Sequence, residues 1–135
     1  MKGNNLKSIK IDYTRSSSKS FEEAVRSVEA ETAKVGFRVL YIHDVQQTLN
    51  EKGFKIEPLK IIEICNAKNA YNVIQKDIRL ALCLPCKINV YVKNGKTYIS
   101  GMRPVLMEKI FPKLDVRNII SEVDTVIKEI INNAK

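Results

Sequence analysis

Two long stretches of the chain place hydrophobic residues three or four positions apart, the spacing that puts them on one face of a helix. The first stretch opens with Ser20 and Glu23, a pair that forms a capping box at a helix N-terminus. We expect this helix to end at Gly36, because glycine readily adopts the left-handed conformation that terminates helices. The residues expected on its buried face are Phe21, Ala24, Val25, Val28 and Thr32.

The second stretch lies in the last part of the sequence, where Asp115 is placed to cap a helix. Its apolar positions are Val116, Ile119, Ile120, Val123, Val126, Ile127, Ile130 and Ile131. Exposing so broad an apolar stripe to water is unfavourable. The helix is therefore expected to cover a sheet or a partner.

Five shorter segments are rich in the aliphatic and aromatic residues typical of strands. They are residues 6–13, expected to form an edge strand before a polar loop at residues 15–19, and residues 37–42, 59–65, 87–93 and 96–102. In the fourth strand, core residues alternate with a polar face formed by Lys87, Asn89 and Tyr91. Asn94 and Gly95 both tolerate positive φ and predict a two-residue type I′ hairpin between the last two strands.

Short helices are expected between the strands. Asp44 and Asn66 each follow a strand and are placed to cap a helix, and residues 104–110 are expected to form a helical turn. Helices interspersed among mostly antiparallel strands indicate an α+β fold. Because no repeat or linker interrupts the pattern, residues 1–135 are expected to form a single domain.

The composition is that of a soluble globular protein, with 44% hydrophobic and 28% charged residues. No apolar run approaches the roughly 20 residues that cross a bilayer, and the start of the chain lacks the apolar stretch of a signal peptide. We therefore expect a cytoplasmic protein without a membrane partner. The odd number of cysteines, three, favours reduced thiols over a disulfide framework.

The net charge of +8 raises the alternative of a nucleic-acid partner, because clustered Lys and Arg side chains neutralise phosphates. Here the basic residues are scattered along the chain, usually with Asp or Glu nearby. A solvated basic surface is the favoured interpretation, and nucleic-acid binding is kept as a second alternative.

An ordered set of short motifs runs through most of the sequence. It comprises Gly36-Phe37, Asp44-Val45 with Leu49, Cys65-Asn66 with Ala70, Leu84-Pro85-Cys86, Val90-Tyr91 with Gly95, and finally Pro104 and Met107. With these motifs, the chain resembles the domain of unknown function 302 family from about Ser20 to the C-terminal helix. The chain departs from the family pattern at Ala67, where proline is usual, and at Cys83, where an aliphatic residue is usual.

The resemblance implies a curved, mainly antiparallel sheet backed by two longer helices, akin to the fold of the TATA-binding protein. It also implies a tendency to form homodimers. It implies almost nothing about reaction chemistry, so the sequence leaves open whether the protein is an enzyme and names no cofactor.

Two cysteines are the best candidates for a site that binds a ligand. Cys65 and Cys86 lie at strand ends, where side chains from a rigid sheet can converge on a pocket. Glu63 shares the strand face of Cys65, and Asn89 lies on the polar face of its strand, so both are added to the candidate ligand-binding residues. The alternative for each is structural: buried small cysteines and solvated sheet residues.

Two further interpretations of the cysteines stay open. Cys83 and Cys86 form a CxxC motif, but the pair leads into a strand, without the helix N-terminus that lowers thiol pKa values in redox proteins. Cys65, Cys83, Cys86 and His43 together supply four soft ligands, the number in a tetrahedral zinc site, although only one close ligand pair exists. They are weak metal candidates.

The leading hypothesis is a small homodimeric binding or accessory domain, for which a small-molecule ligand is one option. The first alternative is a thiol-dependent enzyme or a metal-binding protein that uses Cys65 and Cys86. A hydrolase or nucleotide-binding role is not indicated, because His43 is the only histidine and the five glycines are isolated.

Overall fold

The computed structural model describes residues 10–135, whose strands form one open sheet. The strands are β1 (Asp12–Ser17), β2 (Arg38–Asp44), β3 (Leu59–Cys65), β4 (Cys86–Lys93) and β5 (Lys96–Met102). Their order across the sheet is β1-β5-β4-β3-β2, and every neighbouring pair is antiparallel. The predicted α+β class is confirmed, with β1 and β2 at the two edges.

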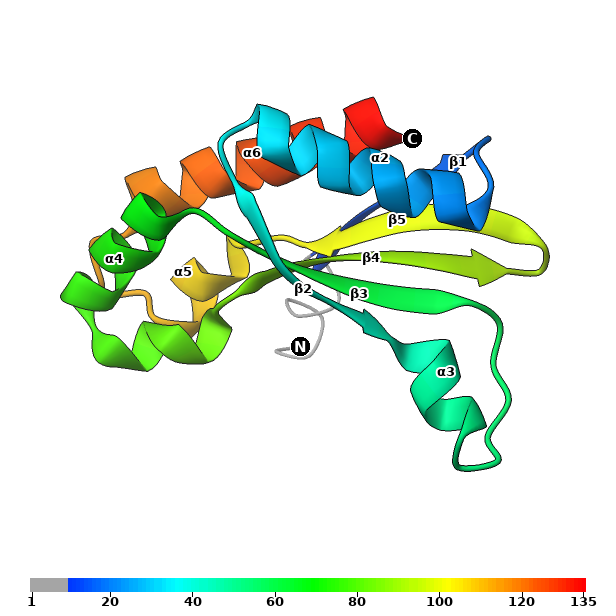
Figure 1. The fold of residues 1–135 in the computed structure, drawn as a ribbon. Coiled ribbons are helices and arrows are strands. Elements are labelled where there is room, and N and C mark those ends of the chain that lie inside the picture. Colours follow the sequence, from blue (N-terminus) through cyan, green and yellow to red (C-terminus); the bar gives the residue numbers. More distant parts are fainter. Residues whose placement is uncertain (1–9) are drawn as a thin grey trace, which may run out of the picture.

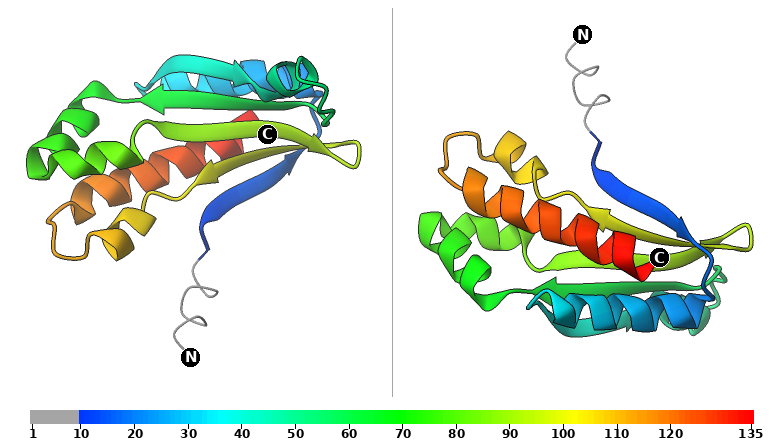
Figure 2. Two further views of the ribbon diagram at one scale, coloured as in Figure 1. Left: turned by 90° about the horizontal axis from the view of Figure 1, so that it is seen from below. Right: turned by 90° about the horizontal axis from the view of Figure 1, so that it is seen from above.

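The two longest helices, α2 (Phe21–Lys34) and α6 (Arg117–Ala134), lie side by side on one face of the sheet (Figures 1 and 2). Helix α3 (Val45–Asn50) lies at one end of the molecule (Figure 1). Helices α4 (Ala67–Lys76) and α5 (Leu106–Ile110) and the 3-10 helix η1 (Ile78–Cys83) gather at the other end. Most of the opposite sheet face has no covering helix from the described residues (Figure 2). None of the described helices is long and apolar enough to span a bilayer.

The main core lies between the sheet and these two helices. The sheet contributes Ile62, Ile64, Ile88, Val90 and Ile99, α2 contributes Ala24, Val25 and Val28, and α6 contributes Val123, Ile127, Ile130 and Ile131. The apolar stripe of α6 is therefore buried against this chain's own sheet. A smaller cluster of Val73, Leu80, Met107, Val116 and Ile120 holds the helices at the far end together.

Local signals in the sequence set most element boundaries. Ser20 and Glu23 form the predicted capping box at the start of α2. Asp44 and Asn66 cap α3 and α4 by accepting hydrogen bonds from backbone N–H groups, as predicted. Asn94 has φ of 53° and Gly95 has φ of 77°, so the turn between β4 and β5 has the positive φ angles of the expected type I′ hairpin.

The position of the first strand was predicted wrongly. Strand β1 runs Asp12–Ser17 and includes part of the expected loop, whereas residues 6–9 of the predicted strand lie outside the described residues. Its register along β5 runs from the pair Asp12 and Met102 to the pair Ser17 and Thr97. Pairing through the backbone tolerates polar side chains at a solvated edge, which is why the polar segment is a strand.

Asp115 does not cap the last helix, contrary to prediction. The N-cap of α6 is Val116, and no side chain caps this helix. Val116 is buried in the second apolar cluster, and this packing determines where the helix begins. The exposed carboxylate of Asp115 instead lies 4.0 Å from the Lys76 ammonium.

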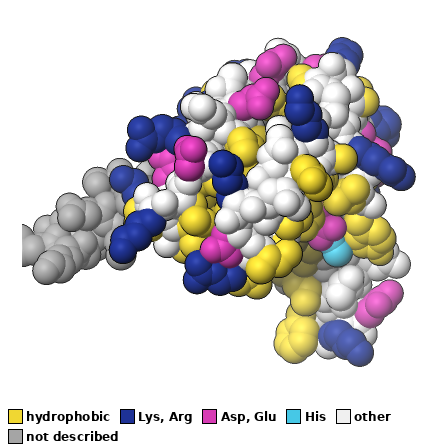
Figure 3. All heavy atoms as spheres, turned by 90° about the vertical axis from the view of Figure 1, so that its left-hand side faces the viewer, with side chains coloured by type: hydrophobic (Ala, Val, Ile, Leu, Met, Phe, Trp, Pro, Cys, Tyr) yellow, Lys and Arg dark blue, Asp and Glu magenta, His cyan; other side chains and the backbone are white. Residues whose placement is uncertain are grey.

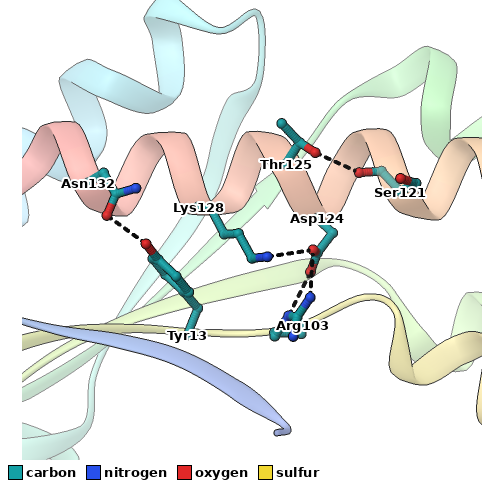
Figure 4. Close-up of polar contacts among 7 residues, drawn as sticks. All are labelled: Tyr13, Arg103, Ser121, Asp124, Thr125, Lys128 and Asn132. Atoms are coloured by element: carbon teal, nitrogen blue, oxygen red, sulfur yellow. Dashed lines mark hydrogen bonds and ion pairs between the residues drawn. The ribbon is translucent and has the colours of Figure 1, made fainter.

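Polar contacts tie α6 to the edge of the sheet (Figure 4). The buried carboxylate of Asp124 accepts hydrogen bonds from Nε and Nη2 of Arg103, which follows β5, at 3.2 and 3.1 Å. Lys128 Nζ lies 3.3 Å from the same carboxylate. On β1, the Tyr13 hydroxyl donates a hydrogen bond of 2.8 Å to Asn132 Oδ1. The helix is thereby fixed to both β5 and β1.

Candidate functional site

The uncovered side of the sheet, here called the open face, carries polar side chains from every strand. Side chains alternate along a strand, so the strand registers define rows across this face. One row contains Thr14, Ser100, Asn89, Ile61 and His43, one residue from each strand in sheet order. Residues from the two edges of the sheet are thus brought onto one surface.

A pocket of about 310 Å³ opens on this face beside η1 and α5, and is called the sheet-face pocket below. Its apolar and thiol lining comes from Ile11, Ile61, Cys83, Pro85, Cys86, Met102, Pro104 and Met107. Its polar lining comes from Asp12, Lys87, Asn89 and Ser100. A mainly apolar wall with a few polar groups is the usual construction of a small-molecule site, and the volume is near the lower end of such sites.

Asn89 is the polar residue of this pocket whose position is hardest to explain by folding alone. Its Oδ1 atom is buried and has no hydrogen-bond partner among the described residues. A buried acceptor without a partner costs about 1–3 kcal/mol. Nearby hydroxyls are already engaged, since Thr14 donates to Asp12 and lies 2.6 Å from the Ser100 hydroxyl. The carboxamide therefore remains available for a bound molecule.

Glu63, a predicted ligand-binding residue, lies on the open face but does not line the sheet-face pocket. Its Oε2 atom is 2.9 Å from His43 Nε2, and the Tyr41 ring contacts the His43 ring edge to face, with centroids 4.6 Å apart. Glu63 thus orients His43, a contact that the sequence did not suggest.

Cys65 and Cys86 do come together, as the sequence predicted. Both line a small apolar pocket of about 30 Å³ near α4 and α6, and Cys86 also borders the sheet-face pocket. Burial raises the pKa of the Cys65 thiol. Burial, reinforced by the neighbouring thiols, raises the pKa of Cys86 to about 11. Both shifts oppose thiolate chemistry, because the nucleophile and the metal ligand are the deprotonated form.

The four suggested metal ligands are not gathered into one site. Among residues 10–135, no group of three or more His, Cys, Asp or Glu side chains is arranged to hold a metal ion. His43 is engaged by Glu63 on the open face. Cys83 ends η1 and Cys86 begins β4, so no helix starts at the CxxC pair.

Two polar residues of the pocket, Asp12 and Ser100, were not anticipated. The alternation in β4 does place Lys87 and Asn89 on one face, as the sequence indicated. Asp12 and Ser100 reach the pocket only through the pairing of β1 with β5 and of β5 with β4. No local signal in the sequence reveals that register.

Charged side chains of both signs are dispersed over the end of the molecule seen in Figure 3. Figure 3 views the end formed by α4, η1 and α5, where Lys and Arg side chains are separated by hydrophobic, acidic and other groups. Along the open face, Asp12 and Glu63 accompany Lys87. This view does not show the continuous basic stripe that typically follows a nucleic-acid backbone.

Comparisons with known proteins agree with this fold. The family model described as "Domain of unknown function DUF302" matches residues 13–134. A crystal structure of an uncharacterized conserved DUF302 protein from Bacillus stearothermophilus is similar, with 26% identity and a TM-score of 0.89. The match covers 94% of this chain and 100% of that one. A search of curated proteins found no match.

Proposed function

Because this chain belongs to the DUF302 family, whose description specifies no activity, we propose a function from its geometry: a homodimeric binding domain that holds a small molecule in the sheet-face pocket. The observation that carries the proposal is the buried, unpartnered Oδ1 of Asn89 beside this pocket. Folded proteins satisfy most buried polar atoms, and an exception calls for a bound partner or a functional role.

The surroundings of Asn89 suit a ligand with an apolar body and a few polar groups. Met102 and Met107 line the pocket, and methionine side chains adapt their shape to different ligands. Strand residues form the floor of the pocket, and Ile11, Cys83, Pro85, Pro104 and Met107 from the adjoining segments complete its lining. The floor is therefore held by the main-chain hydrogen bonds of the sheet. A preorganised floor reduces the entropy lost on binding.

Native mass spectrometry of protein purified without metal-affinity steps tests the ligand. We expect the native mass per chain to exceed the denatured mass of the chain, and this excess to disappear in an Asn89→Leu variant. The same substitution is expected to stabilise the ligand-free protein by about 1 kcal/mol, because it removes a buried unsatisfied group. Tyr91→Phe is the matched control, since Tyr91 lies on the same strand and face without lining the pocket.

A native mass per chain equal to the denatured mass, together with a loss of stability in Asn89→Leu, would show that Asn89 has a purely structural role. The ligand part of the proposal would then be abandoned. Excess mass that persists in Asn89→Leu would place the ligand elsewhere on the molecule.

The dimeric part of the proposal is supported by bulky side chains at the border of the open face. Ile11, Tyr41 and Met102 are 57%, 59% and 58% exposed. Burial of apolar surface contributes about 25 cal/mol per Å², so a second copy packed here would gain from covering them. Because the apolar stripe of α6 is buried within this chain, the open face replaces that helix as the candidate interface.

Gel filtration with light scattering at micromolar concentration tests the dimer. We expect a dimer for the natural chain and a shift toward monomer for Tyr41→Ser combined with Met102→Ser. Leu82→Ser is the control, because Leu82 is 87% exposed and lies on η1, not on a strand of the open face. A monomer for the natural chain would overturn this part of the proposal.

A further inference from the structure

The charged groups that line the sheet-face pocket are one acid and one base, Asp12 and Lys87. Asp12 pairs with Met102, and Lys87 lies beside Met102 because its neighbour Ile88 pairs with Gly101. Asp12, Met102 and Lys87 therefore form a second row across the open face. Since adjacent strands are about 4.8 Å apart, the backbones of Asp12 and Lys87 are separated by about 10 Å.

Asp12 and Lys87 do not form an ion pair with each other. Among the described residues neither Asp12 nor Lys87 forms an ion pair. The Lys87 ammonium has one long contact of 3.5 Å with the Pro85 carbonyl. Glu63, which pairs with Lys87 from β3, is engaged by His43. Asp12 accepts a hydrogen bond from Thr14 through one carboxylate oxygen. Both groups can therefore bind a ligand.

We infer that the sheet-face pocket takes a small zwitterion of the α-amino acid class with an apolar side chain. Asp12 holds the ammonium group, Lys87 holds the carboxylate, and the apolar body packs on Met102 and Met107. Two hydrogen bonds of about 2.8 Å at the ends of an α-amino acid span roughly 8–9 Å, and the backbones of Asp12 and Lys87 are about 10 Å apart. The long, flexible side chain of Lys87 adjusts the reach between the two ends. This inference rests on the proposed function and specifies its ligand.

Three probes of nearly equal shape distinguish the contributions of the ammonium group and the carboxylate to binding. They are L-leucine, 4-methylpentanoate, which lacks the ammonium, and 3-methylbutylamine, which lacks the carboxylate. Binding to the full chain is measured by chemical-shift titration of backbone amides. We expect L-leucine to bind about tenfold or more tightly than either single-charge probe, because each of those probes lacks one of the two charge-assisted hydrogen bonds. Equal binding of all three probes, or none, would overturn the inference.

Two variants assign each end of the ligand. Lys87→Met is expected to bind L-leucine no more tightly than 3-methylbutylamine. Asp12→Asn is expected to bind L-leucine no more tightly than 4-methylpentanoate. Lys93→Met is the matched control on the same strand and face, outside the pocket. Circular dichroism of each variant checks its fold, and the three probe affinities of the natural chain test the inference even where a variant fails to fold.

The two proposals fail in different ways. If the purified protein retains a molecule that Asn89→Leu loses, but L-leucine shows no advantage over the other probes, the binding function stands and the zwitterion is wrong. If no molecule is retained and no probe shifts the pocket amides, both proposals fail.

Discussion

Cys86 lies between two pockets, yet its environment makes it a poor nucleophile. Burial raises the pKa of Cys86 to about 11 from an ordinary value of 9.0. At pH 8 this difference leaves about a hundredfold less thiolate than an ordinary cysteine has, and the thiolate is the form that reacts. We therefore expect alkylation of Cys86 by iodoacetamide to be at least tenfold slower in the native protein than in denaturant, as measured by peptide mass spectrometry.

The denatured protein is the matched control, because the same thiol then has its ordinary pKa and full access to reagent. Rapid native labelling of Cys86 would contradict the burial argument. It would also restore the thiol-dependent enzyme as a competitor of the binding domain.

The packing of α6 on the sheet depends on a glycine in β5. A Cβ atom at Gly101 would lie 2.9 Å from Ile127 Cγ2 and 3.2 Å from Ile131 Cδ1, closer than carbon atoms pack. Gly101→Ala is therefore expected to lower the free energy of unfolding by about 1–3 kcal/mol, as measured in urea, because the helix must move away from the strand.

A double-mutant cycle separates this clash from other effects. Ile127→Leu removes the Cγ2 branch, so the combined variant should lose less stability than the sum of the two single changes. Additive losses would show that Gly101 is required for some other reason.

Asp124 joins α6 to the residues that follow β5, and its loss is expected to weaken that junction. Asp124→Asn keeps the side-chain volume but removes the charge that accepts from Arg103 and Lys128. We expect a loss of about 1.5–3 kcal/mol in urea unfolding at pH 7, the usual range for hydrogen bonds to charged groups. Thr125→Ala is the control on the same helix, because its exposed hydroxyl bonds only the Ser121 carbonyl. Similar small losses for both variants would contradict a structural role for the Asp124 charge.

Elements that are determined by nearby residues could be predicted from the sequence. The capping box of Ser20, the cap of Asn66 and the Asn94-Gly95 turn each depend on contacts within a few residues, and all three are present. Strand β1 could not be placed, because its register depends on β5, whose paired residues are 80 to 90 positions away in the chain. The start of α6 was missed because burial of Val116, a tertiary contact, decides it.

The candidate site was predictable only where a single strand supplies it. Alternation along β4 indicated Asn89, and strand ends indicated Cys65 and Cys86. Asp12 and Ser100 belong to the pocket because separate strands pair beside β4. The buried state of Asn89 Oδ1 also needed the structure, since a strand asparagine is usually solvated.

Over the whole molecule, three carboxyl groups make folding sensitive to acid. Hydrogen bonds from Ser20 lower the pKa of Glu23, and hydrogen bonds from Arg79 lower the pKa of Asp77 to about 2. Burial of Asp124 opposes its ionisation, but Arg103 and Lys128 outweigh this and hold its pKa below the usual value. A group with a lowered folded-state pKa stabilises the fold above its unfolded pKa, about 3.9 for Asp and 4.3 for Glu, and loses that effect as the pH falls through the folded pKa.

We therefore expect the free energy of unfolding in urea to decline as the pH is lowered from about 4.3 toward 2. The difference between the natural chain and Asp124→Asn isolates one group within this decline. That difference should be fully present from pH 7 down to about pH 4 and should shrink at lower pH, because a protonated Asp124 carries no more charge than asparagine. A difference that stays constant down to pH 2 would mean that Asp124 acts through its shape, and that its charge contributes nothing to the attachment of α6 to the sheet.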